Sequence, residues 1–157
     1  MIMSGPLRLG SLLVTKRLMI LTACCFLWFP TPVFAGCKEK LQNVPESMVY
    51  PQTWDDFYKS YQVYGDCGAT GWMAEAFSDA VARLFAKDWK NFSRFVVLSN
   101  ENKVFLGFTL HHIDATADPD DLKAALKNVT VDCPRKAKGL CEEIKKELTL
   151  ALKDAEL

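Results

Sequence analysis

The chain has 157 residues, of which 50% are hydrophobic, and its 19 lysine and arginine residues balance 19 aspartate and glutamate residues. This length is enough for one domain with its own core and too short for two. The balanced charge, with no block of basic residues, argues against nucleic acid or anionic lipid as the main partner.

Residues 1–35 have the pattern of a cleavable export signal. Their only charged residues are basic, and the apolar run of residues 18–29 follows them. That run suits the hydrophobic part of a signal peptide and is too short to span a membrane. We therefore expect cleavage after Ala35, a periplasmic or extracellular location, and a mature domain of residues 36–157. The mature part has 16 basic and 19 acidic residues, a net charge of −3, and contains no membrane span.

The mature part keeps four cysteines, an even number that predicts two disulfides in a small exported domain. Cys133 and Cys141 flank Pro134 and can close a short loop, which leaves Cys37 to pair with Cys67. The alternative, in which Cys67 pairs with Cys133 or Cys141, ranks close behind.

Cys37 also ends the sequence Phe-Ala-Gly-Cys, which resembles a lipid-attachment motif with an unusual first residue. A lipid anchor at Cys37 would leave an odd number of thiols among the remaining cysteines. We therefore favour the disulfide over the lipid anchor.

The first part of the mature chain, residues 36–52, shows no sustained period and predicts an extended N-terminal arm. Thr53 then starts a helix, because its hydroxyl can cap the helix and Asp56 follows three residues on. Gly65 is a natural terminating residue for that helix.

Further helices are predicted in chain order. Residues 69–89 carry a clear apolar stripe, and residues 90–99 continue the helical pattern. Residues 102–113 are too uniformly apolar for the period to decide, and we favour a helix. Asp118 with Pro119 begins another helix, and the last runs from about Leu140. The sequence therefore predicts an all-α fold, an irregular bundle of about five helices with an extended arm, stapled by disulfides.

An aromatic stripe on the first long helix is the candidate partner-binding surface. Trp54, Tyr58 and Tyr61 fall at helical spacing, and tryptophan and tyrosine are enriched at protein interfaces. A small helical domain also needs aromatic residues in its core, which is the stronger reading. We expect Tyr58 and Tyr61 to be the exposed members.

His111, His112 and Asp114 are the candidate ligand or metal residues. His111 and Asp114 are three residues apart, a spacing that lets two side chains on a helix share a metal. The two adjacent histidines diverge, so a structural role for both, with one half-buried and one at the surface, outweighs the metal site. We expect no cofactor.

Glu75, Asp79 and Arg83 follow one another at intervals of four on the second helix. Two carboxylates at this spacing can do acid–base work when a cleft encloses them. On an amphipathic helix they more often form a solvated polar face with an ion pair, and we favour that interpretation.

No nucleophile motif, metalloprotease motif or phosphate-binding glycine loop occurs in the chain. We therefore expect a non-enzymatic domain that binds another protein of the envelope or secreted fraction. In outline it is similar to immunity and inhibitor proteins that act on an envelope toxin or hydrolase. The alternative is a carrier of a small ligand or metal in the cell envelope.

Overall fold

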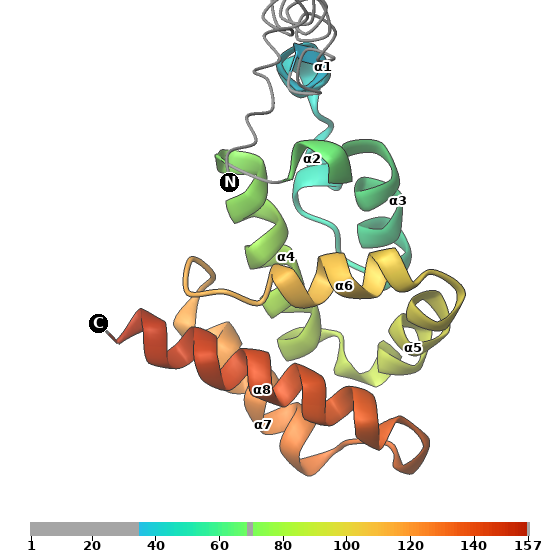
Figure 1. Ribbon diagram of the computed structural model, residues 1–157, viewed down its shortest axis with the longest axis vertical. Helices are drawn as coiled ribbons and strands as arrows, with labels where there is room; N and C mark the ends of the chain where they lie inside the picture. Colours follow the sequence, from blue (N-terminus) through green and yellow to red (C-terminus); the bar gives the residue numbers. More distant parts are fainter. Residues whose placement is uncertain (1–34, 69–70, 157) are drawn as a thin grey trace, which may run out of the picture. The chain divides into compact units, whose positions relative to one another are not determined.

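The computed structural model describes residues 35–68 and 71–156. The signal predicted for residues 1–35 lies, apart from Ala35, outside the described residues. Within them the fold is all-α, as predicted, and contains no β-strand. Eight helices form it (Figure 1): α1 (Ala35–Lys40), α2 (Glu46–Val49), α3 (Trp54–Tyr64), α4 (Trp72–Lys87), α5 (Phe92–Glu101), α6 (Lys103–His111), α7 (Pro119–Val131) and α8 (Lys138–Ala155).

The N-terminal arm is more helical than expected. Where the sequence indicated an extended segment, the chain forms the short helices α1 and α2, and the described residues contain eight α-helices where about five were predicted. Pro45 stands at the N-cap of α2 with φ −59°. A proline there costs no hydrogen bond, because the first backbone N–H groups of a helix have no internal partner.

Polar side chains cap the helices that the sequence predicted. Thr53 accepts a hydrogen bond from the Asp56 N–H at 3.2 Å, and Asp118 accepts one from the Asp120 N–H at 2.8 Å. Asn102 accepts one from the Phe105 N–H at 3.0 Å. This last cap starts α6 and confirms the helix in the segment where hydrophobic periodicity could not decide.

Gly65 is the C-cap residue of α3, as predicted, but it does not have the backbone conformation usual for a terminating glycine. A terminating glycine is usually left-handed, but Gly65 is right-handed, with φ −59°. A Cβ on Gly65 would lie 2.8 Å from Cδ2 of Tyr61, so the missing side chain makes room for the tyrosine ring. The left-handed glycine is Gly71, with φ +71°, at the N-cap of α4.

The core is rich in aromatic rings. The Phe57 side chain has no exposed surface, and its ring centroid lies 5.7 to 6.3 Å from those of Phe77, Phe105 and Phe108. On the other side of the core, α4 packs on α7 and α7 packs on α8 (Figure 1). The aromatic cluster therefore joins α3, α4 and α6, while smaller aliphatic residues fill the space between α4, α7 and α8.

Both disulfides have the connectivity that the sequence ranked first. Cys37 pairs with Cys67, 30 residues later, and fastens α1 to the short 3-10 helix η2 (Gly65–Cys67). Cys133 pairs with Cys141 and closes the loop between α7 and α8. None of the described helices has the length and apolar character needed to cross a membrane.

Candidate partner-binding groove

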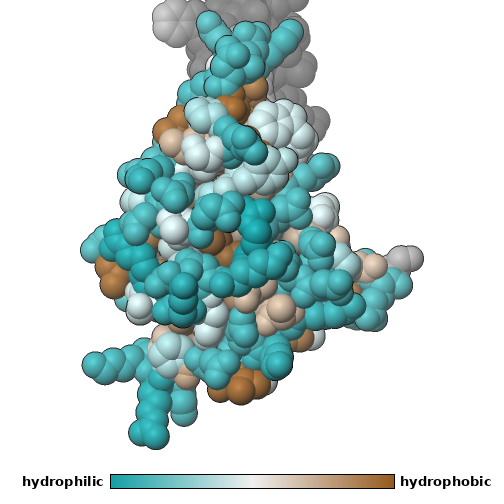
Figure 2. Space-filling model, turned by 180° about the vertical axis from the view of Figure 1, so that it is seen from behind, coloured by the Kyte–Doolittle hydropathy of each residue, from teal (hydrophilic) through white to brown (hydrophobic). Residues whose placement is uncertain are grey.

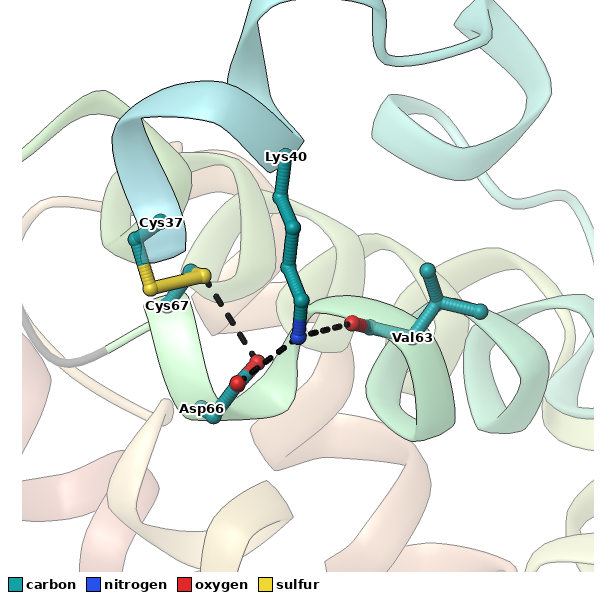
Figure 3. The surroundings of a disulfide bond; sticks show 5 residues. All are labelled: Cys37, Lys40, Val63, Asp66 and Cys67. Atoms are coloured by element: carbon teal, nitrogen blue, oxygen red, sulfur yellow. Dashed lines mark hydrogen bonds and ion pairs between the residues drawn. A yellow bond between two sulfur atoms is a disulfide. The ribbon is translucent and has the colours of Figure 1, made fainter. Parts of the chain in front are cut away.

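A groove opens between α1, α3, η2 and α6, with a volume of about 630 Å³. It is bounded by segments that are far apart in the sequence, and the Cys37–Cys67 disulfide lies at its α1 side (Figure 3). Its lining combines aromatic, aliphatic, polar and charged side chains: Lys40, Tyr61, Gln62, Gly65, Asp66, Val104 and Phe108.

Two half-buried aromatic rings form the apolar part of the groove. The ring centroids of Tyr61 and Phe108 are 4.9 Å apart, and Tyr61 also lies 5.1 Å from Phe105 in the core. Because Phe105 is fully buried, its packing fixes where the Tyr61 ring lies. The groove therefore presents a rigid aromatic surface, of the kind that contributes most to protein binding.

The edge of the groove carries an exposed valine and an ion pair. Val104 is 73% exposed. Lys40 Nζ lies 2.8 Å from Asp66 Oδ2 and donates a second, longer bond of 3.5 Å to the Val63 carbonyl, as Figure 3 shows. Both charged side chains are about half exposed, so their pairing contributes little to stability. An apolar centre with a polar rim is the usual anatomy of a protein interface.

Figure 2 shows the molecule from behind the view of Figure 1. Hydrophilic residues cover most of the surface seen in Figure 2, and the hydrophobic residues on it form small separate patches. Scattered apolar residues of this kind are normal on a soluble protein.

The three aromatic residues predicted for partner contact have different positions. Tyr61 lines the groove. The Tyr58 ring centroid lies 5.9 Å from that of Tyr61, and the Tyr58 hydroxyl accepts a hydrogen bond from Asn102. Trp54 is only 1% exposed, and its ring centroid lies 4.5 Å from that of Phe95. Trp54 is therefore a core residue and is not available to a partner at this surface.

The histidines and Asp114 do not form a common site in the described part of the chain. His111 is exposed, whereas His112 is 3% exposed. The His112 Nδ1 lies 2.8 Å from the Phe108 carbonyl oxygen and its Nε2 lies 3.0 Å from that of Gly68. With both ring nitrogens engaged, His112 joins α6 to the end of η2 and has no free nitrogen for a metal.

Asp114 is held by hydroxyl groups. Its Oδ2 accepts a bond of 2.6 Å from Ser78, and its Oδ1 accepts bonds from the Thr116 hydroxyl and N–H. Burial alone would raise the pKa of Asp114, but these hydrogen bonds to the charged form outweigh it and leave the pKa below its ordinary value.

Replacing Ser78 with alanine should lower the free energy of unfolding by about 1–3 kcal/mol at neutral pH, because a buried acceptor loses its donor. A carboxyl group whose pKa is lowered in the folded state stabilises the protein at pH values above the pKa of the unfolded state, which is near 4. This stabilisation is lost as the pH falls below that value. The variant should therefore show a smaller loss of stability between about pH 5 and pH 2 than the parent. Urea unfolding across that range measures both effects, with Thr149→Ala on the exposed face of α8 as the control. An equal acid dependence in parent and Ser78→Ala would contradict the role given to this hydrogen bond.

The polar face of α4 exposes its two carboxylates, but the ion pair predicted for it is not among the ion pairs of the described residues. Glu75 and Asp79 are exposed, whereas Arg83 is half-buried and donates a bond of 3.1 Å to the Pro51 carbonyl. Asp79 and Arg83 line an open, charged cavity of about 550 Å³ together with Lys87 and Asp121. Partial burial raises the pKa of Asp79, against the opposing effects of a backbone hydrogen bond at Asp118 and the charge of Arg83. The two carboxylates of α4 are not enclosed together, which is what acid–base catalysis by this pair would need.

A smaller cavity of about 240 Å³ lies where α3 and α5 begin. Trp54 and Asp88 are among the residues that line it, and Trp54 Nε1 and Asp88 Oδ2 are buried without a hydrogen-bond partner. The ion pair between Asp55 and Arg94, at 2.7 Å, stands beside them. The residues that line the cavity thus include one buried donor and one buried acceptor without partners.

Sequence reasoning missed most of the groove. Val104 and Phe108 lie four residues apart on one face of α6, a signal that was present in the sequence. Lys40 and Asp66 gave no such local signal, because they are 26 residues apart and meet beside the Cys37–Cys67 disulfide.

Comparisons with protein-family models, with curated proteins and with solved structures found no match for this chain. The functional proposal therefore depends on the geometry of the molecule.

Proposed function

We propose that this protein is an exported, non-enzymatic domain that binds another protein through the groove between α1, α3 and α6. The observation that carries the proposal is the aromatic pair Tyr61 and Phe108, half-exposed in a hollow of about 630 Å³ and rimmed by polar residues. Aromatic residues held rigidly in a partly enclosed site are typical anchors of protein interfaces.

The compartment and charge support the same proposal. Two disulfides within a small domain persist in an oxidising compartment and are rare in the cytosol. The exported part has a net charge of −3, which favours approach by a basic partner. An inhibitor or immunity-type protein acting on a basic envelope toxin or hydrolase fits these properties.

The test is recovery of the partner from oxidising envelope and secreted fractions with the tagged protein, followed by measurement of the affinity. Tyr61→Ala should weaken binding by about 2 kcal/mol, roughly 30-fold, the loss typical of an interface anchor. Tyr50→Ala, which removes a tyrosine that is 52% exposed and does not line the groove, is the matched control and should bind normally.

Circular dichroism of both variants separates a loss of contact from a loss of fold, because Tyr61 also packs on Phe105. Recovery of no partner at low or moderate salt would contradict the proposal. Equal affinities of the two variants would place the interface elsewhere.

A second candidate function, carriage of a small ligand, is favoured by the cavity that contains Trp54 and Asp88. Trp54 and Asp88 line this cavity, and their buried atoms Trp54 Nε1 and Asp88 Oδ2 have no partner; a ligand hydroxyl that reached them would accept a bond from the first and donate one to the second. A carrier of this kind would recover no protein in the pull-down, so the same experiment distinguishes the two functions.

A further inference from the structure

The Cys37–Cys67 disulfide lies beside a carboxylate. One ligand atom from each of Cys37, Asp66 and Cys67 lies within 4.8 Å of the other two. Asp66 Oδ1 is 3.6 Å from Cys67 Sγ, and Figure 3 shows the carboxylate next to the disulfide. Two sulfur atoms and one carboxylate oxygen therefore lie close enough together to be ligands of one metal ion.

Lys40 orients the carboxylate in this cluster. Its ammonium group holds Asp66 Oδ2 at 2.8 Å and leaves Oδ1 on the side of Cys67. Metal-binding carboxylates are commonly fixed in this way, with a hydrogen-bond donor on the oxygen that does not bind the metal. Asp66 is thus already positioned as a ligand before any metal arrives.

We propose that Cys37, Cys67 and Asp66 bind a zinc ion when the disulfide is reduced. Two thiolates and a carboxylate are ligands that Zn²⁺ accepts, and water can complete a tetrahedral set of four. The proposal goes beyond the protein-binding function and does not depend on it.

The chemistry needs a dithiol reductant. The dithiol gives two electrons and two protons to the Cys37–Cys67 disulfide, whose S–S bond breaks, and the reductant becomes a disulfide itself. Zn²⁺ then displaces the two thiol protons and forms two zinc–sulfur bonds. The oxidised protein lacks the thiolates, so the redox state decides whether the site exists.

The site is accessible. Cys37 is partly exposed, and the Asp66 side chain is 48% exposed. A reductant can therefore reach the disulfide from the side of α1, and a metal can reach the carboxylate.

The second disulfide provides an internal comparison. Cys133 also follows an aspartate, Asp132, and pairs with Cys141. In the described residues, however, no third ligand joins that pair. Equal reduction of both disulfides should therefore create one three-ligand site, at Cys37 and Cys67.

The experiment is a titration of the reduced protein with Co²⁺, a coloured substitute for Zn²⁺. The full chain is expressed, purified as cells process it, and reduced without oxygen by a phosphine, which avoids a competing thiol. We expect one equivalent of Co²⁺ to bind, with a near-ultraviolet sulfur-to-cobalt charge-transfer band that Zn²⁺ abolishes. The oxidised protein should show no band.

Four variants locate the site. Cys37→Ser should abolish the band, and the double variant Cys133→Ser/Cys141→Ser should keep it. Asp66→Asn should weaken binding by about 10–100-fold, while the matched change Asp132→Asn should leave the affinity unchanged. These outcomes together establish the three ligands.

The proposal is overturned if no band appears, if the band survives Cys37→Ser, or if it needs Cys133 and Cys141. Equal affinities of the Asp66→Asn and Asp132→Asn variants would also overturn it. Because reduction lowers stability, the titration is repeated with Co²⁺ present during reduction, so that a fold held by the metal is also detected. A protein that binds no Co²⁺ under either protocol lacks the site.

Discussion

Replacing Phe57 with alanine should lower the free energy of unfolding by about 3–5 kcal/mol. Phe57 has no exposed surface, and its ring touches a ring of α4, Phe77, and two rings of α6, Phe105 and Phe108. Alanine would leave a cavity where three helices meet, and the neighbouring rings are too tightly packed to fill it.

The measurement is urea unfolding followed by far-ultraviolet circular dichroism. A domain of this size is stable by about 5–15 kcal/mol, so the variant should be folded but close to its limit. Phe57→Leu should lower the free energy of unfolding clearly less than Phe57→Ala, because leucine keeps most of the side-chain volume. Val104→Ala, at a residue that is 73% exposed, is the control and should change stability by less than about 0.5 kcal/mol. A Phe57→Ala loss as small as that of the control would contradict the described core.

Removing the Cys37–Cys67 disulfide should destabilise the protein more than removing Cys133–Cys141. The first closes a loop with a sequence separation of 30 and the second a loop with a separation of 8. By restricting the unfolded chain, the Cys37–Cys67 disulfide should stabilise the protein by about 3.6 kcal/mol and the Cys133–Cys141 disulfide by about 2.5 kcal/mol. The two Cys→Ser double variants, unfolded in urea under the same conditions, give the comparison.

The longer loop should also have a visible local effect. Without Cys37–Cys67, the Lys40 contacts with Asp66 and the Val63 carbonyl remain as polar links between α1 and the end of α3, and these are exposed. Hydrogen exchange should therefore accelerate more in α1 than in α4 and α7, where the increase should match the loss of global stability. An equal acceleration in all three helices would show that removing the disulfide does not loosen the arm locally.

The sequence predicted the long helices well because their signals are local. Caps such as Thr53 and Asp118 act within three residues, and the apolar stripe of α4 repeats along one helix. The pairing of the cysteines followed from loop length and the turn at Pro134 in the same way.

The sequence could not predict features that depend on contacts between distant segments. Gly65 looked like a helix terminator, but its role is set by the Tyr61 ring that lies over it. The sequence favoured Tyr58 and Tyr61 over Trp54 as the exposed members of the aromatic stripe, but both tyrosines are half-buried, and contacts with α5 and α6 set the positions of Trp54 and Tyr61. The packing of these rings, and the ring that lies over Gly65, depend on tertiary contacts, which no local pattern encodes.

In the groove, the residues that stabilise the fold are different from the exposed residues that a partner would contact. Its inner surface continues into the core through Tyr61 and Phe105, so changes there disturb folding. Its edge is formed by exposed side chains such as Gln62 and Val104. Surface substitutions of this kind have small effects on stability. If the groove binds a partner as we propose, substitutions at its edge can change the binding specificity, while selection for a foldable chain preserves the aromatic residues at its base.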